Sequence, residues 1–258
     1  MTWHCGARDG VRLACRDYGG QGPPVVLLHG LAGYAEEWAE TARGLGEARR
    51  VLALDQRGHG RSERNPEDVS QAAFVCDVEF WLEHFELASA TIIGQSLGGL
   101  TAFLFAARRP RLIDRLVVAE ATPAADPEAP AAVSSWLDQW RQPFASFDDA
   151  LAFFGDTNWG RTWASGLDHR DGGYWPGFHA DTMIRAITET ATSSYWNEWR
   201  SIACPTLVVR GQTGIPASTL ARMLDELPTA QAVTIRSAGH DIHLEQPAQW
   251  NQAIHNFI

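Results

Sequence analysis

The sequence has no excess of positive charge. Its 258 residues include 31 Asp and Glu but only 21 Lys and Arg, which gives a formal net charge of −10. Proteins that bind nucleic acid or anionic membranes usually present a basic surface to phosphate groups. We therefore expect neither nucleic acid nor a membrane as partner, and a small-molecule substrate instead.

Cysteine is also scarce, and long apolar runs are absent. The four cysteines form no C-x-x-C pair and lie at no ligand spacing from a histidine, so neither a zinc site nor a disulfide framework is predicted. No apolar stretch approaches the roughly 20 residues that a membrane span needs, and the N-terminus has no signal-like pattern. We expect a cytoplasmic protein, a monomer or a homodimer, that needs no metal or cofactor.

Short β-branched runs alternate with longer amphipathic stretches along the chain, which predicts an α/β fold with a mostly parallel twisted sheet flanked by helices. An Asp9-Gly10 turn predicts an opening hairpin. The buried strands are expected at 25–28, 51–54, 90–93, 116–119, 206–209 and 232–235, and the helices at 35–46, 70–87, 97–109, 217–227 and 247–257. In such a sheet the carboxyl ends of the strands share one edge, where ligands bind.

The alternation breaks after the sixth strand. We predict a core domain of residues 1–122 and 196–258, with residues 123–195 inserted as a small helical cap. Seven of the eleven tryptophans lie in or beside this insertion: Trp136, Trp140, Trp159, Trp163, Trp175, Trp196 and Trp199. They either form the core of the cap or line an apolar cavity beneath it.

The strongest local signal is the G-x-S-x-G sequence that runs from Gly94 to Gly98. It follows a predicted strand and precedes a predicted helix, so Ser96 is expected at a tight, strained turn with its hydroxyl exposed above the sheet. The amide of Leu97 at the helix N-terminus would stabilise negative charge beside Ser96. A second donor is expected from the amide of Leu31, in the glycine-rich turn after the first buried strand.

A serine hydroxyl needs a positioned base, and His240 is the candidate because it follows the last predicted strand at the same sheet edge. His29 and His59 lie in glycine-flanked turns, where we predict structural hydrogen bonds. His243 and His255 have no special sequence context.

Together these segments resemble the α/β-hydrolase fold family over nearly the whole chain. The motifs that carry the resemblance are His29-Gly30, the segment from Asp55 to Ser62, the segment from Gly94 to Gly99, and Ala238-Gly239-His240. The resemblance implies that Ser96 is the nucleophile, His240 the base, Leu31 and Leu97 the oxyanion amides, and residues 121–195 approximately the cap. It assigns Asp55 and Arg57 to shaping a turn rather than to catalysis.

The resemblance also implies a triad acid, and here the sequence departs from the commonest family pattern. The loop after the penultimate strand, residues 210–218, contains no Asp or Glu. The family's other position for the acid is the end of the preceding strand, where Glu120 follows Ala119, and we predict Glu120 as the acid. A triad without a working acid is the alternative, and four other carboxylates are weaker candidates: Asp241, which adjoins the base and should project away from it, Asp225, Asp114 and Asp126.

Such a site suits acyl transfer on an ester, lactone, thioester or related carbonyl bond. The tryptophans favour an apolar or aromatic small substrate, although Arg141, Arg161 or Arg170 could provide a local positive charge. Alternatives are a carbon-carbon bond hydrolase, a hydrolase-like receptor with little turnover, which the acid-free loop supports, and a tailoring enzyme that uses His240 differently.

Overall fold

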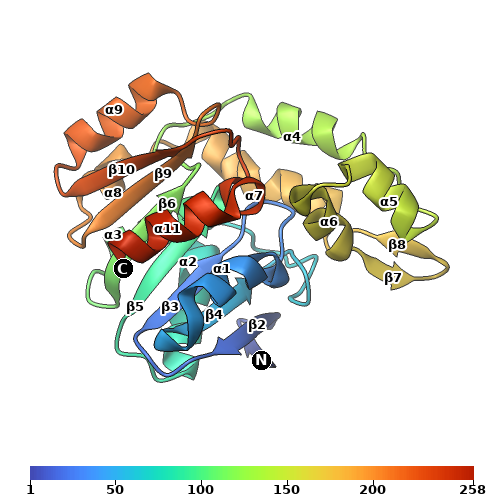
Figure 1. Ribbon diagram of the computed structural model, residues 1–258, viewed down its shortest axis with the longest axis horizontal. Helices are drawn as coiled ribbons and strands as arrows, with labels where there is room; N and C mark the ends of the chain where they lie inside the picture. The colour runs from blue at the N-terminus through green and yellow to red at the C-terminus, as the bar shows by residue number, and fades with distance from the viewer.

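The computed structural model describes residues 1–258 and contains an eight-stranded sheet in the order β1-β2-β4-β3-β5-β6-β9-β10 (Figure 1). The hairpin of β1 and β2 pairs antiparallel with β4, and the remaining strands are parallel. The predicted α/β sheet is confirmed. The strands are β1 (Thr2–Arg8), β2 (Val11–Gly19), β3 (Pro24–Leu28), β4 (Arg50–Asp55), β5 (Ala90–Gln95), β6 (Ile113–Ala119), β9 (Thr206–Gly211) and β10 (Ala230–Ile235).

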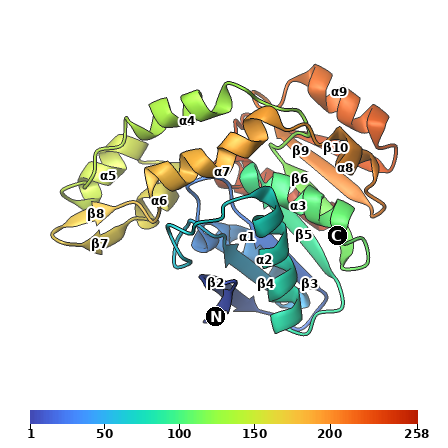
Figure 2. The ribbon, with the colours of Figure 1, turned by 180° about the vertical axis from the view of Figure 1, so that it is seen from behind.

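Helices cover both faces of the sheet. On one face lie α1 (Ala39–Leu45), preceded by the 3-10 turn η1 (Ala35–Trp38), and α11 (Pro247–Phe257); the short 3-10 turn η2 (Gly46–Ala48) follows α1 (Figure 1). On the other lie α2 (Gln71–His84), α3 (Leu97–Arg108), α8 (Trp196–Arg200) and α9 (Ala217–Glu226), seen from behind in Figure 2. The short helix α10 (Ile242–Glu245) was not predicted.

The strand side chains alternate between two hydrophobic layers because successive residues of a strand point to opposite faces. In β3, Val26 and Leu28 belong to the cluster under α2, α3 and α8, whereas Val25 and Leu27 belong to the cluster under α1 and α11. All four are essentially inaccessible to solvent. Burial on both faces explains why β3 is a continuous apolar run without polar alternation.

The chain between β6 and α8 lies over the carboxyl ends of the strands (Figure 1). It consists of α4 (Ala129–Leu137), α5 (Phe147–Phe154), α6 (Asn158–Ser165), the hairpin β7 (Asp168–Arg170) and β8 (Gly173–Trp175), and α7 (Ala180–Thr192). The hairpin was not expected in a helical insertion. Trp140, Phe144, Phe154 and Phe178 form a separate aromatic cluster in this segment.

None of the helices combines the length and the hydrophobicity that crossing a membrane requires.

Candidate active site

Ser96 lies at a sharp turn between β5 and α3, with φ 52° and ψ −117°. A positive φ is costly for any residue with a Cβ, so the surrounding contacts must hold this conformation in place. The Ser96 amide donates a hydrogen bond to the carbonyl of Ala119 at 2.8 Å, and its carbonyl accepts one from the Leu100 amide at 2.9 Å. The strained turn predicted at Ser96 is thus present.

The glycines on either side of Ser96 make this turn sterically possible. A Cβ on Gly94 would lie 2.1 Å from the carbonyl oxygen of Gly98. A Cβ on Gly98 would lie 2.2 Å from the carbonyl oxygen of Leu28. Only hydrogen fits at both positions, because strand β5, helix α3 and the end of β3 approach each other backbone to backbone.

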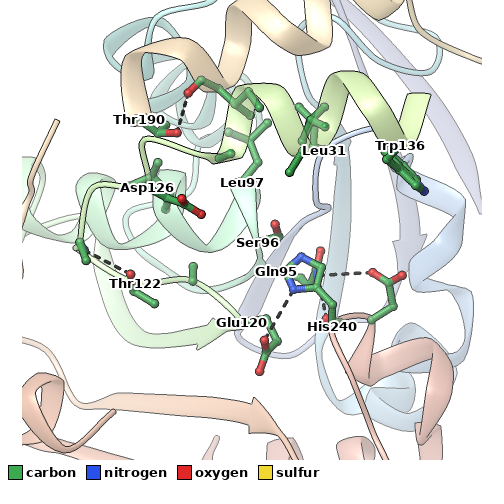
Figure 3. A pocket seen from close by; sticks show the side chains of 18 of the residues that line it. Leu31, Gln95, Ser96, Leu97, Glu120, Thr122, Asp126, Trp136, Thr190 and His240 are labelled. Atoms are coloured by element: carbon green, nitrogen blue, oxygen red, sulfur yellow. Dashed lines mark hydrogen bonds and ion pairs between the residues drawn. The ribbon is translucent and has the colours of Figure 1, made fainter. Parts of the chain in front are cut away.

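Glu120 directly follows β6 and faces His240. Its Oε2 lies 3.6 Å from His240 Nδ1, and the Glu120 side chain is almost completely buried whereas 58% of the His240 side chain is exposed. Glu120 has a φ of 50°, a second strained non-glycine residue at this edge of the sheet. The structure therefore places a buried carboxylate against one nitrogen of an imidazole whose other side is accessible (Figure 3).

The loop without an acid after β9 holds the Glu120 carboxylate. The amides of Gly211 and Ile215 donate hydrogen bonds to its oxygens at 2.7 and 3.1 Å. A Cβ on Gly214 would lie 2.0 Å from Glu120 Oε1, so the loop leaves room for the carboxylate only because glycine stands there. The loop therefore supplies hydrogen-bond donors to an acid that comes from the neighbouring strand.

Two side chains that the sequence analysis missed fix the backbone around His240. The Glu245 carboxylate accepts hydrogen bonds from the amides of Gly239 at 2.8 Å and Asp241 at 2.9 Å, the residues before and after His240. The Gln95 side-chain amide donates to the His240 carbonyl at 2.9 Å. Gln95 precedes Ser96, so this bond connects the serine turn directly to the histidine loop.

The electrostatic surroundings of His240 favour its protonated form. Desolvation of the ring lowers its pKa, but the nearby carboxylates of Glu120, Asp241 and Glu245 outweigh that effect and raise the pKa above its ordinary value. An imidazole in its neutral form can accept a proton from a serine hydroxyl and return it later in a reaction.

Leu31 and Leu97 line the same cavity as Ser96 (Figure 3). Leu97 is the first residue of α3, so its amide has no partner within the helix. The loop that carries Leu31 approaches the serine turn closely, since a Cβ on Gly30 would lie 3.3 Å from the Ser96 Cβ. The structure thus brings all five residues singled out from the sequence to one edge of the sheet.

A cavity of about 550 Å³ opens above Ser96, between the sheet edge and the inserted segment. Of the seven tryptophans, Trp136, Trp159 and Trp163 line this cavity. Trp140 belongs to the aromatic cluster of the insertion, while Trp196 and Trp199 are buried under α3 in the main core. Trp175, half-buried on β8, stacks under Arg170. Trp140 therefore fits the core interpretation, and Trp136, Trp159 and Trp163 fit both, because they line the cavity and also pack against the insertion's aromatic cluster; the other three fit neither.

The remaining carboxylates do not contact the His240 ring in the way Glu120 does. Asp241 lies at the cavity but accepts a hydrogen bond from the Trp159 indole at 2.5 Å and from Gln95 at 3.4 Å. Asp114 accepts from the Ser89 hydroxyl, and Asp225 lies within α9. Asp126 accepts from the amide of Glu128 next to the start of α4.

His29 and His59 have the structural role predicted for them. Both are fully buried. His29 Nε2 accepts from the Gln56 amide at 3.0 Å, and His59 Nδ1 bonds the Arg57 carbonyl at 2.9 Å. Burial lowers the pKa of His59 to about 4, so this ring is neutral at physiological pH.

His243 has a role that its sequence context did not indicate. It is buried, pairs with Glu37 at 3.1 Å and stacks on Trp38 with ring centroids 4.1 Å apart. It therefore fastens α10, which follows the His240 loop, to η1, which follows the Leu31 loop.

Asp55 and Arg57 act in the local structure, as expected. Asp55 accepts from the amides of Ala35 at 2.6 Å and Arg61 at 2.8 Å. Arg57 makes a buried two-point ion pair with Asp77, with N–O distances of 2.7 and 2.6 Å.

Comparison with known proteins identifies similar sequences and structures. The family model for the alpha/beta hydrolase fold matches residues 23–247. The sn-1-specific diacylglycerol lipase ABHD11 of Mus musculus is 27% identical, over 92% of this chain and 81% of the relative. The 2-(acetamidomethylene)succinate hydrolase of Mesorhizobium japonicum is 25% identical, over 93% of this chain and 89% of the relative.

One solved structure, that of an E-2-(acetamidomethylene)succinate hydrolase, superposes with a TM-score of 0.89 at 24% identity and covers 98% of this chain and 99% of the other. At this level of identity the likeness concerns the fold.

Proposed function

The chain belongs to the α/β-hydrolase fold family, and from that premise we propose that it is a serine hydrolase that cleaves an ester, lactone or related carbonyl bond of a small apolar substrate. Ser96 is the nucleophile, His240 the base, Glu120 the acid, and the amides of Leu31 and Leu97 form the oxyanion hole. Residues 123–195 act as the cap that closes the substrate cavity.

The proposed reaction has two halves. His240 takes the proton of the Ser96 hydroxyl while the oxygen attacks the substrate carbonyl, and the oxygen of the tetrahedral intermediate accepts hydrogen bonds from the two amides. The protonated ring then donates its proton to the leaving group, which leaves an acyl-Ser96 intermediate. In the second half His240 activates a water molecule that hydrolyses this intermediate and releases the acid.

The observation that carries the proposal is the setting of Glu120. A buried carboxylate that accepts two loop amides and faces His240 Nδ1 is suited to hold the ring in one tautomer and to stabilise its protonated form. The same setting weakens the receptor alternative, because the acid-free loop that supported it donates its amides to Glu120.

The activities named for the two relatives support the ester class without fixing the substrate. A diacylglycerol lipase acts on an ester, whereas a 2-(acetamidomethylene)succinate hydrolase acts on a compound that carries carboxylates. Carbon-carbon bond cleavage would use the same triad, but no contact in the cavity favours it over ester cleavage.

A series of p-nitrophenyl esters from acetate to octanoate tests the proposal. We expect a burst followed by turnover, both abolished by Ser96→Ala, and no loss in the control Ser218→Ala, which changes an exposed serine in the first turn of α9. Binding of the esters without turnover by the unmodified protein would refute the enzyme proposal in favour of a receptor.

A further inference from the structure

We propose that the cavity accepts esters whose acyl group is uncharged and rejects acyl groups that carry a carboxylate, an inference that rests on the proposed hydrolase function. The feature behind it is the charge of the cavity wall. The 21 residues that line the cavity include three carboxylates, Glu120, Asp126 and Asp241, but no arginine. The whole chain contains no lysine, so arginine is its only permanently charged side-chain cation.

None of the three arginines that could have supplied a positive charge lines the cavity. Arg161 forms an ion pair with Asp156 on the surface of α6. Arg170 pairs with Asp171 in the turn of the β7–β8 hairpin and stacks over Trp175. Arg141 does not line the cavity.

Several neutral donors in the wall are also occupied, whereas the Trp163 indole has no hydrogen-bond partner. The Trp159 indole donates to Asp241, and the Thr190 hydroxyl donates to the Ile187 carbonyl at 2.7 Å. The Tyr195 hydroxyl points to Glu189, at 3.4 Å. His240 is the one base in the wall whose protonation creates a cation, and its ring already faces Glu120.

A carboxylate on the acyl group would therefore lose its water without gaining a counter-ion. Burial of an unpaired anion is strongly unfavourable, and the wall carboxylates add repulsion. The wall is well suited to hydrocarbon instead. Ala129, Ala132, Val133 and Trp136 follow the i, i+3, i+4, i+7 spacing of a single helix face, and all four line the cavity from α4.

A matched pair of substrates tests this selection: p-nitrophenyl butyrate and mono-p-nitrophenyl succinate, which have acyl groups of four carbons that differ in a terminal carboxylate. We expect kcat/KM for the succinate to be lower by a factor of about 100 or more, because an unpaired carboxylate is very costly to bury. The methyl ester of the same succinate separates charge from size, and its kcat/KM should return to within about tenfold of the butyrate value. Comparable turnover of butyrate and free succinate would overturn the inference and leave the hydrolase function standing.

A substitution in the wall provides the converse test. Ala132 is exposed on α4 and lines the cavity, so Ala132→Arg adds a cation there with little expected effect on the fold. We expect this variant to reduce the preference for butyrate over succinate by about tenfold or more, whereas the uncharged control Ala132→Gln should leave it unchanged. If Ala132→Arg and Ala132→Gln changed the preference equally, the charge of the side chain would not be its cause.

If the proposed hydrolase function is wrong, no ester is turned over. The preference for uncharged acyl groups can then be measured as a difference in binding affinity. Fluorescence reports this binding, because Trp136, Trp159 and Trp163 line the cavity and a nitrophenyl group quenches their emission. Ser96→Ala should bind the butyrate at least about tenfold more tightly than the succinate. Equal affinities would refute the charge selection whatever the catalytic function.

Discussion

Glu120 and His240 are 120 residues apart in the sequence, yet the Glu120 carboxylate lies 3.6 Å from His240 Nδ1. We expect Glu120→Gln to reduce kcat by about 10²- to 10⁴-fold with little change in KM, because the ring loses the negative charge that orients it and stabilises its protonated form. Ester hydrolysis measured beside the control Glu226→Gln, a surface glutamate of α9, checks this. Nearly full activity in a folded Glu120→Gln protein would remove Glu120 from the site.

The sequence predicts Ser96 and His240 because their signals are local. A G-x-S-x-G segment between a strand and a helix, and a histidine after the last strand, both describe positions at one sheet edge, and the parallel topology brings them together. Glu120 has no such signal of its own. It followed from the family's second position for the acid, and the structure adds the physical reason, which is the set of amides that the acid-free loop presents to it.

Gln95 and His243 were not predicted because their functions depend on contacts between distant segments. The Gln95 bond to the His240 carbonyl spans 145 residues and the His243 contact with Glu37 spans 206. No periodicity or motif encodes such pairs. The hairpin of β7 and β8 was missed for a related reason: its strands have three residues each, too few to show alternation.

Gly214 provides a test of the loop that holds Glu120. We expect Gly214→Ala to lower kcat by about tenfold or more, because its Cβ would lie 2.0 Å from Glu120 Oε1 and must displace the carboxylate or the loop. The control Gly177→Ala meets nothing closer than 3.6 Å and should retain activity. Equal kcat values for the two variants would show that the carboxylate does not depend on this space.

Glu245 provides a test of the hydrogen bonds that position His240. Glu245→Gln keeps one acceptor oxygen and replaces the other with a donor, which cannot accept the second of the Gly239 and Asp241 amides. We expect kcat to fall by about tenfold or more while KM changes little, since the ring is displaced without a change in the cavity wall. A purely structural role would instead lower the thermal midpoint and leave kcat of the folded protein intact.

The pH dependence of kcat/KM should follow the ionisation of His240. A general base must be neutral to act, so activity rises with pH through its pKa, which lies above its ordinary value because Glu120, Asp241 and Glu245 outweigh desolvation. Asp241→Asn removes one of these negative charges, so the pKa falls and the acidic limb moves to lower pH. The control Asp225→Asn on α9 should leave the limb in place. A limb that stays fixed or moves to higher pH in Asp241→Asn would contradict this electrostatic assignment.

The buried ion pair between Arg57 and Asp77 concerns stability rather than catalysis. Both side chains are almost fully buried and meet at two points, so Asp77→Ala leaves an uncompensated guanidinium in the interior. We expect the free energy of unfolding, measured by urea titration, to fall by about 3–5 kcal/mol. The control Glu79→Ala changes a residue of the same helix, α2, and removes its partially exposed ion pair with Arg109. We expect this variant to lower the free energy of unfolding by less than about 1 kcal/mol. Because water can solvate Arg109 but not Arg57, similar losses in the two variants would mean that burial does not set the difference.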